Sequence, residues 1–276
     1  MNAIENAVKT QVRYLAERWR DSVEIPRIFD RDSRRANTEK IDVEVLDGRP
    51  FASEIRLDTQ GFELFDFASP ITDFTNDEAV TSIYRPAIAE FVKKQTHALD
   101  VFVTQHLIRT ESKDDFNKAY ARFLHCDYSM DTARSASLNL LKNRNLDPAD
   151  FENAEFAWYN SWQPFDNPVE QNPLCMLDST SLRDEDIVEY VYGGYGKSAK
   201  SSMPMYRKEH RFYYFKNMQP SEVVLIKQLD TRTGRAPVAP HTSFIDPAAK
   251  IDARPRRSIE VRMMAVFESG RSSRHI

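Results

Sequence analysis

The stretch Ser258-Ile-Glu-Val-Arg-Met-Met-Ala-Val-Phe267 predicts a long and largely buried β-strand near the end of the chain. Successive side chains of a strand point to opposite faces of a sheet. This alternation places Ile259, Val261 and Met263 on one face, and Arg256, Ser258 and Arg262 on the other. The apolar face suits a core, so the polar face is free to carry chemistry.

Many shorter segments of this kind precede it and decide the fold class. Predicted strands cover 41–45, 51–57, 62–67, 101–108, 122–128, 155–162, 174–177, 211–215 and 223–229, and predicted helices cover 3–22, 86–98 and about 131–144. Asp47-Gly48 is a hairpin signal between the first two strands. Because helices and strands do not alternate as βαβ units, the pattern favours an antiparallel, mainly β sandwich or barrel with flanking helices.

No repeat or linker divides the 276 residues, so we expect a single domain over 1–276. In it, a helix and strands from 1–100 would pack on a core formed by 101–268. The segment 193–204 contains three of the seven glycines and is predicted to be a mobile loop that closes over substrate.

Composition excludes several functions. The seven glycines form no G-x-G-x-x-G, and Gly194-Tyr-Gly-Lys-Ser198 lacks the first glycine of a phosphate-binding loop because Val191 stands there. A net charge of −4 and a pI of about 5.9 argue against nucleic-acid binding. The two cysteines suit a reducing compartment, and no apolar run approaches the ~18 residues of a membrane span. We expect a cytoplasmic protein without a membrane partner.

His125-Cys126-Asp127 is the motif that points to a metal. In a strand, the imidazole of His125 and the carboxylate of Asp127 project from the same face. His241 lies far downstream and could supply a third ligand. Two histidines and one carboxylate form the facial triad of non-haem Fe(II) oxygenases, which leaves positions open for a cosubstrate and O₂. On its own the tripeptide is a weak signal, since most histidines are packed or surface residues.

A second motif raises that prediction. Fifteen residues after His241 comes Arg256-Arg257-Ser258, at the start of the strand over 258–267. A guanidinium with a neighbouring hydroxyl suits the distal carboxylate of 2-oxoglutarate, because a planar bidentate donor matches a carboxylate. Arg262 lies on the same face and could share this work. The alternative for the motif alone is a solvated basic patch.

The chain also resembles a known family in these segments. The runs 211–218, 221–230, 240–247 and 255–262, together with 125–129 and the later Asn172-Pro-Leu174, are similar to the cephamycin-type hydroxylase and gibberellin-desaturase-like family of Fe(II)/2-oxoglutarate enzymes. The resemblance covers roughly 120–268. It implies a double-stranded β-helix (jelly-roll, cupin-like) fold, iron ligands His125, Asp127 and His241, and a 2-oxoglutarate site at Arg256 and Ser258.

The resemblance also directs attention to the substrate pocket. We expect Tyr128, Trp162, Gln163 and Tyr213 to line it, although aromatic residues in strands are often plain core. One departure concerns Gln163, which stands where the family often has an arginine in Trp-Arg-Pro. Loss of that charge would signal a different ligand.

These observations predict an Fe(II)/2-oxoglutarate-dependent dioxygenase that hydroxylates or desaturates a small, secondary-metabolite-type substrate. The alternatives are a cupin-type metal-dependent dioxygenase or isomerase without 2-oxoglutarate, and a non-catalytic jelly-roll binding protein. Neither alternative requires Arg256-x-Ser258. The apolar side of 3–22 would pack on the sheet or on a second copy of the chain, so a homodimer is left open.

Overall fold

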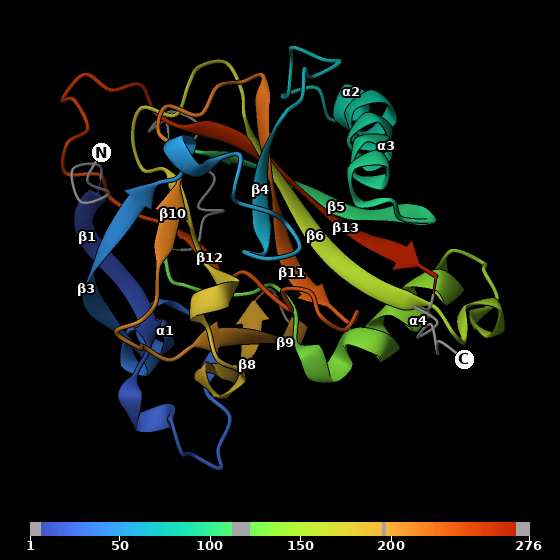
Figure 1. Ribbon diagram of the computed structural model, residues 1–276, viewed down its shortest axis with the longest axis horizontal. Helices are drawn as coiled ribbons and strands as arrows, with labels where there is room; N and C mark the ends of the chain where they lie inside the picture. Colours follow the sequence, from blue (N-terminus) through green and yellow to red (C-terminus); the bar gives the residue numbers. More distant parts are fainter. Residues whose placement is uncertain (1–6, 112–121, 195–196, 269–276) are drawn as a thin grey trace.

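The computed structural model describes residues 7–111, 122–194 and 197–268 and is built mainly from strands (Figure 1). The helices are α1 (Arg31–Asn37), α2 (Asp77–Ala79), α3 (Arg85–Thr96) and α4 (Ala133–Asn143). The strands are β1 (Ala7–Leu15), β2 (Arg27–Ile28), β3 (Thr38–Asp47), β4 (Phe62–Asp66), β5 (Asp100–Thr110), β6 (Glu155–Pro164), β7 (Leu174–Leu177), β8 (Ile187–Gly194), β9 (Lys197–Pro204), β10 (Phe212–Tyr214), β11 (Glu222–Asp230), β12 (His241–Ser243) and β13 (Arg257–Phe267).

Within the described residues, two five-stranded sheets form the body of the molecule. Their strand orders are β1-β3-β10-β7-β12 and β4-β11-β6-β13-β5, and a three-stranded sheet, β2-β8-β9, adjoins them. Met176 of β7 and Phe215, the residue after β10, come from the first five-stranded sheet. They pack in one buried cluster with Trp162 of β6 and Val224 of β11 from the second sheet. The two sheets therefore face each other across a shared core.

Strand β13 has the two predicted faces. Ile259 and Val261 pack in a cluster with Ile88 and Val92 of α3, which covers the outer face of this sheet (Figure 1). The opposite face carries Arg262, which contacts Asp127. The predicted separation of an apolar and a polar face is confirmed for the first half of β13, whereas Met264 and Val266, further along the face of Arg262, pack in another apolar cluster.

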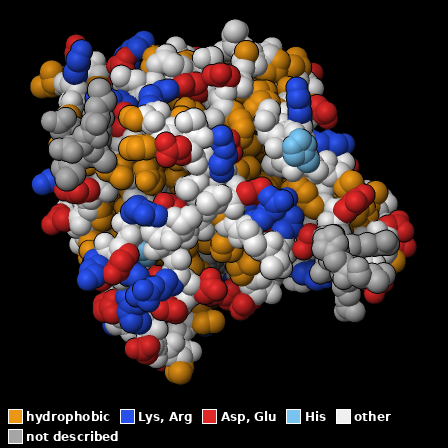
Figure 2. Space-filling view, viewed as in Figure 1, with side chains coloured by type: hydrophobic (Ala, Val, Ile, Leu, Met, Phe, Trp, Pro, Cys, Tyr) orange, Lys and Arg blue, Asp and Glu red, His pale blue; other side chains and the backbone are white. Residues whose placement is uncertain are grey.

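Most predicted elements are present. The strands expected over 41–45, 62–67, 101–108, 155–162, 174–177, 211–215, 223–229 and 258–267 correspond to β3, β4, β5, β6, β7, β10, β11 and β13, and the helices expected over 86–98 and 131–144 correspond to α3 and α4. Among the described residues, no helix is long and apolar enough to cross a membrane. On the face in Figure 2, basic and acidic side chains are interspersed.

The helix predicted over 3–22 is wrong for residues 7–22, and its first four residues, 3–6, lie outside the described residues. Residues 7–15 form β1, which pairs antiparallel with β3 from Ala7↔Leu46 to Leu15↔Thr38. Val8, Val12 and Leu15 fit a helical spacing, but Val8, Val12 and Tyr14 also share one face of a strand. Pairing with β3 decides between the two patterns, and it buries Val12 and Tyr14.

The hairpin predicted at Asp47-Gly48 is also wrong. Strand β3 is flanked by β1 and by β10, which pairs parallel to it, so no edge is left for a strand over 51–57. The chain instead enters a 3-10 turn at Arg49–Phe51, and Gly48 has a φ of −77° rather than the positive φ of a tight hairpin turn. Ile55 and Leu57 lie in the turns that follow, and their side chains are nevertheless buried.

The segment 122–128 is not a regular strand. It makes isolated bridges instead, His125 to His241 and Cys126 to Ser202, and so links β12 of one sheet to β9 of another.

The mobile loop predicted over 193–204 is mostly wrong as well. Strands β8 and β9 form a hairpin paired from Ile187↔Pro204 to Gly194↔Lys197, and only 195–196 of that segment lie outside the described residues.

Candidate metal centre

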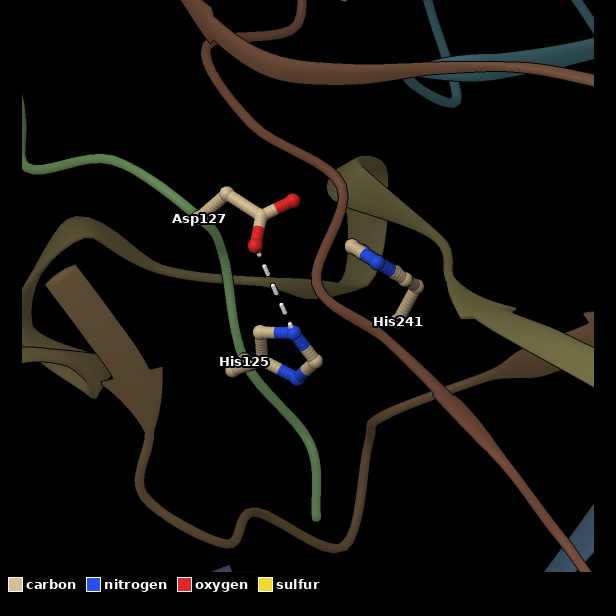
Figure 3. Close-up of side chains that lie close together, drawn as sticks. All are labelled: His125, Asp127 and His241. Atoms are coloured by element: carbon tan, nitrogen blue, oxygen red, sulfur yellow. Dashed lines mark ion pairs between the residues drawn. The ribbon is translucent and has the colours of Figure 1, made fainter. Parts of the chain in front are cut away.

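Two chain segments bring His125, Asp127 and His241 together. His125 and Asp127 lie on the bridging segment, and His241 begins β12. The main chains of the two histidines exchange hydrogen bonds: His125 N donates to His241 O at 3.2 Å, and His241 N donates to His125 O at 3.0 Å. One potential ligand atom from each side chain lies within 4.8 Å of the other two (Figure 3). The structure thus assembles the three residues that the sequence singled out.

The protonation states suit a metal. Burial lowers the pKa of His125, and burial together with the neighbouring His125 lowers the pKa of His241 to about 4. Burial alone would raise the pKa of Asp127, but the Arg262 guanidinium together with His125 and His241 outweighs burial and keeps that pKa below its usual value. At neutral pH the group is two neutral imidazoles and one carboxylate, which is a donor set that suits a divalent first-row metal.

Hydrogen bonds fix the orientation of each donor. The Nδ1 of His125 lies 2.8 Å from Phe123 O, which makes it the donating nitrogen and leaves Nε2 for a metal. Asn160 Nδ2 donates to Asp127 Oδ2 at 2.5 Å, and the Arg262 guanidinium lies 2.6 Å from Oδ1. Gln228 accepts a hydrogen bond from Asp127 N at 2.9 Å, and its amide nitrogen lies 3.4 Å from His241 Nδ1.

The β8–β9 hairpin holds the main chain of the same segment. Cys126 N donates to Ser202 O at 2.9 Å. The hydroxyl of Ser201 donates to Asp127 O at 3.1 Å, and that of Ser202 donates to Tyr128 O at 3.2 Å. The hairpin that the sequence suggested as a mobile lid is therefore a support for the Asp127 backbone.

A small cavity adjoins the triad. His125, His241, Trp162, Arg109, Arg256 and Glu260 are among the residues that line it. Arg256 is buried, donates through Nη1 to Asn172 O at 2.7 Å, and places its guanidinium 5.6 Å from the centre of the Trp162 ring. The hydroxyl of Ser258 is buried and has no hydrogen-bond partner within the described ranges. The Nη2 of Arg256 lies 3.3 Å from Glu111 Oε1, so the guanidinium already faces one carboxylate. A buried guanidinium and an unsatisfied buried hydroxyl two residues apart fit a carboxylate ligand.

Arg262 does not lie where the sequence suggested. It was expected as a second arginine for 2-oxoglutarate, but its Nη2 contacts Asp127 and its Nε donates to Glu260 Oε1 at 2.8 Å. Burial alone would lower the pKa of Arg262, but these two carboxylates raise it well above its usual value. Both ends of its guanidinium are thus committed to neighbouring carboxylates. This arrangement makes Arg262 a support for Asp127.

The four residues expected in the substrate pocket lie in different places, and of these only Trp162 is among the residues that line the cavity. Trp162 lines the cavity beside the triad. The ring centre of Tyr128, the residue directly after Asp127, lies 4.5 Å from that of Trp158. Tyr213 packs against Phe51 and Phe62, with ring centres 6.5 and 6.1 Å away.

Gln163 does not lie in the substrate pocket as predicted, because its side chain lies on the opposite face of β6 from Trp162. It accepts a hydrogen bond from Tyr84 at 2.6 Å and donates to Phe67 O and Pro220 O. The residue therefore lies in the core beneath α2 and α3, and the absence of a charge at this position does not bear on a ligand in the cavity.

Replacing Gln163 with methionine is expected to destabilise the fold by about 2–3 kcal/mol, because it leaves the buried Tyr84 hydroxyl and two carbonyls unsatisfied. Denaturant unfolding measures this loss. The affinities for Fe(II) and 2-oxoglutarate are expected to stay at wild-type values. A change in either affinity would show that Gln163 contributes to the ligand pocket.

Four polar residues around the triad were missed by the sequence interpretation. They are Arg109, Asn160, Gln228 and Glu260, one from each of β5, β6, β11 and β13. The available signal was a polar residue inside an apolar strand, as in Val-Val-Leu-Ile-Lys-Gln-Leu over 223–229. Gln228 also lies at an irregularity in the pairing of β11 with β6, between Lys227 and Leu229, which no sequence pattern announced.

The fold and the site together define a mainly β protein with a candidate metal centre of two histidines and one carboxylate. A family model described as "Oxidoreductase/YMDC permease-like domain" matches residues 13–267, and the chain belongs to that family.

Named relatives refine this class. The chain is 29% identical over 254 residues to the hydroxylase/desaturase efuI of Hormonema carpetanum, covering 82% of this chain and 83% of that protein. It is also 29% identical over 245 residues to the alpha-ketoglutarate-dependent dioxygenase phiK of a fungal species, covering 84% and 86%. The predicted resemblance to hydroxylase/desaturase and Fe(II)/2-oxoglutarate enzymes is confirmed.

A solved structure shows the same fold. The iron and alpha-ketoglutarate-dependent endoperoxidase NvfI superposes with a TM-score of 0.80 at 22% identity, over 96% of this chain and 99% of that one. The strand arrangement described above is thus shared with an enzyme of known structure.

Proposed function

We propose that this chain is a non-haem Fe(II)/2-oxoglutarate-dependent dioxygenase that hydroxylates or desaturates an unactivated C–H bond of a small, secondary-metabolite-type molecule. The observation that carries the proposal is the group of two neutral imidazoles and one carboxylate within 4.8 Å, beside a cavity lined by buried Arg256. Relatives named as hydroxylase/desaturases and dioxygenases support the same class.

His125, Asp127 and His241 would hold the iron on one side and leave its other positions open. Iron bound there supplies O₂ activation coupled to the oxidative decarboxylation of 2-oxoglutarate to succinate and CO₂. Asn160 and Arg262 keep the Asp127 carboxylate oriented, and Phe123 O keeps the His125 ring in the tautomer with a free Nε2. The protein's part is to orient these groups and to keep water from the site.

Arg256 and Ser258 are proposed to bind the distal carboxylate of 2-oxoglutarate. Arg256 lines the cavity just before β13, and Ser258 follows two residues later with an unsatisfied hydroxyl that can donate to a carboxylate oxygen. The indole of Trp162 flanks the Arg256 guanidinium and would hold it in place. Tyr128, which follows the ligand Asp127, is proposed to form a wall on the substrate side.

The finer architecture and setting follow from the same proposal. Two facing five-stranded sheets with a metal site between them support a double-stranded β-helix, or jelly roll, in one domain over 1–276. We propose a cytoplasmic enzyme whose partner is a small molecule rather than a nucleic acid or a membrane. A homodimer stays a prediction.

Anaerobic titration of the purified protein with Fe(II) and then 2-oxoglutarate tests the proposal. We expect a visible metal-to-ligand band when both are present, and succinate on exposure to oxygen. A protein that binds Fe(II) but forms neither the band nor succinate would be a cupin-type enzyme that does not use 2-oxoglutarate. A protein that gives the band but no succinate with any candidate substrate would be a binding protein.

A further inference from the structure

Glu260 is a buried carboxylate next to the proposed metal centre and was not among the residues expected to act there. It lies in β13 opposite Trp162 of β6 and Leu107 of β5. Glu260 is 4% exposed and lines the same cavity as His125 and His241. A fully buried carboxylate is costly unless it is paired, so its partners show what it does.

Two arginines hold Glu260, one on each oxygen. Arg109 of β5 donates to Oε2 through Nε at 3.1 Å and through Nη2 at 3.0 Å. Arg262 donates to Oε1 through Nε at 2.8 Å, and its Nη2 reaches Asp127 Oδ1 at 2.6 Å. The four side chains form a continuous line of alternating charge that ends on the metal-site carboxylate.

The order of charges in this line has a consequence for a cation. Arg262 lies against Asp127, and Arg109 also lines the cavity, so two guanidinium groups border a centre that must accept a dication. Like charges repel strongly in a water-poor interior. Glu260 is the carboxylate that both guanidinium groups share, and these two arginines keep the pKa of Glu260 well below its usual value although burial would raise it. It is therefore ionised and cancels part of their field.

We propose that Glu260 is a positioning residue of the metal centre, which holds Arg262 on Asp127 and neutralises Arg262 and Arg109 so that a divalent cation can bind. This inference rests on the proposed function. Glu260 touches neither substrate nor metal in this role and acts through Arg262.

The Glu260→Gln variant separates this role from a purely structural one. It keeps the shape of the side chain and removes its charge. With Co(II) as the metal probe, followed by visible absorption, we expect affinity to fall about 10–100-fold, as for other groups that orient metal ligands. In the metal-free protein we expect 2-oxoglutarate to bind more tightly than in wild type, because the cavity has lost a negative charge. A structural lesion would weaken both.

A double variant gives a second, independent measurement. Glu260→Gln combined with Arg109→Gln removes one negative and one positive charge, and the loss of a whole ion pair disturbs a fold less than the loss of one partner. We expect the double variant to regain part of the Co(II) affinity that the single variant loses, because removing Arg109 restores the charge balance but not the contact that holds Arg262. The inference is overturned if the double variant binds Co(II) no better than the single one.

Glu222→Gln is the matched control. Glu222 lies on β11 of the same sheet, separated from β13 by β6, and is held by both terminal nitrogens of Arg49, at 2.8 and 2.6 Å, rather than by the arginines beside the triad. We expect wild-type Co(II) affinity from this variant. The inference is wrong if Glu260→Gln also keeps wild-type affinity, or if it weakens Co(II) and 2-oxoglutarate together. If wild-type protein binds no Co(II) or Fe(II), the proposed function fails first.

Discussion

The His241→Ala variant is expected to bind Fe(II) at least about 100-fold more weakly than wild type and to form no detectable succinate. Loss of a group that only orients a ligand already costs 10–100-fold in metal affinity, so loss of a ligand costs at least as much. The neutral His241 ring, whose pKa lies at about 4, offers a lone pair throughout the neutral range. Anaerobic Fe(II) titration and succinate assay are the measurements.

His210→Ala is the control for this variant. The His210 side chain is also buried, but its Nδ1 is 3.0 Å from the Tyr14 hydroxyl and its ring stacks on Tyr14 rather than on a member of the triad. We expect reduced stability and unchanged Fe(II) affinity. Wild-type Fe(II) affinity in His241→Ala would show that this residue is not a ligand.

Arg256→Lys and Arg262→Lys are expected to affect different ligands. A lysine cannot form the bidentate pair that a guanidinium forms with a carboxylate. For Arg256→Lys we expect 2-oxoglutarate to bind about 10- to 100-fold more weakly, since charge-assisted hydrogen bonds contribute about 1.5–3 kcal/mol, with Fe(II) affinity unchanged. For Arg262→Lys we expect weaker Fe(II) binding, because Arg262 contacts Asp127 and Glu260 rather than the cavity anion site.

Calorimetric titration of 2-oxoglutarate into the Fe(II)-loaded protein, at a metal concentration that saturates each variant, measures the first effect. Titration of Fe(II) alone measures the second. A reversed pattern, in which Arg262→Lys loses 2-oxoglutarate and keeps Fe(II), would assign the anion site to Arg262. Arg254→Lys serves as the control, since Arg254 pairs with Glu170 at the surface.

Local patterns were sufficient to predict the five strands of the sheet β4-β11-β6-β13-β5 and the helices α3 and α4. Alternation identified β13 and its two faces, and a proline near the start with buried residues at helical spacing identified α3. They failed where a pattern fits two structures and a distant strand decides between them. Val8, Val12 and Tyr14 suit a strand as well as a helix, and only pairing with β3 fixes the outcome.

The site was predictable to the extent that its residues lie in short motifs. His125-x-Asp127, His241 and Arg256-x-Ser258 are local spacings, and the structure brings His125, Asp127, His241 and Arg256 into one region, with Ser258 two residues beyond Arg256. The roles of Arg262 and Gln163 were not predictable. Arg262 shares a strand face with Arg256, and only the three-dimensional arrangement places Asp127 and Glu260 beside it. Gln163 follows cavity-lining Trp162 by one residue, and that single step turns it to the other face.

The reciprocal hydrogen bonds between the main chains of His125 and His241 join segments that are far apart in the sequence. In an unfolded chain, closing so long a loop would cost conformational entropy, and a metal would have to meet that cost from its own binding energy. In the folded protein the paired main chains of His125 and His241 close this loop themselves. The free energy of metal binding is therefore not spent on closing the loop, and it can serve to select one metal over another. We also expect that a chelator removes the metal without unfolding the protein.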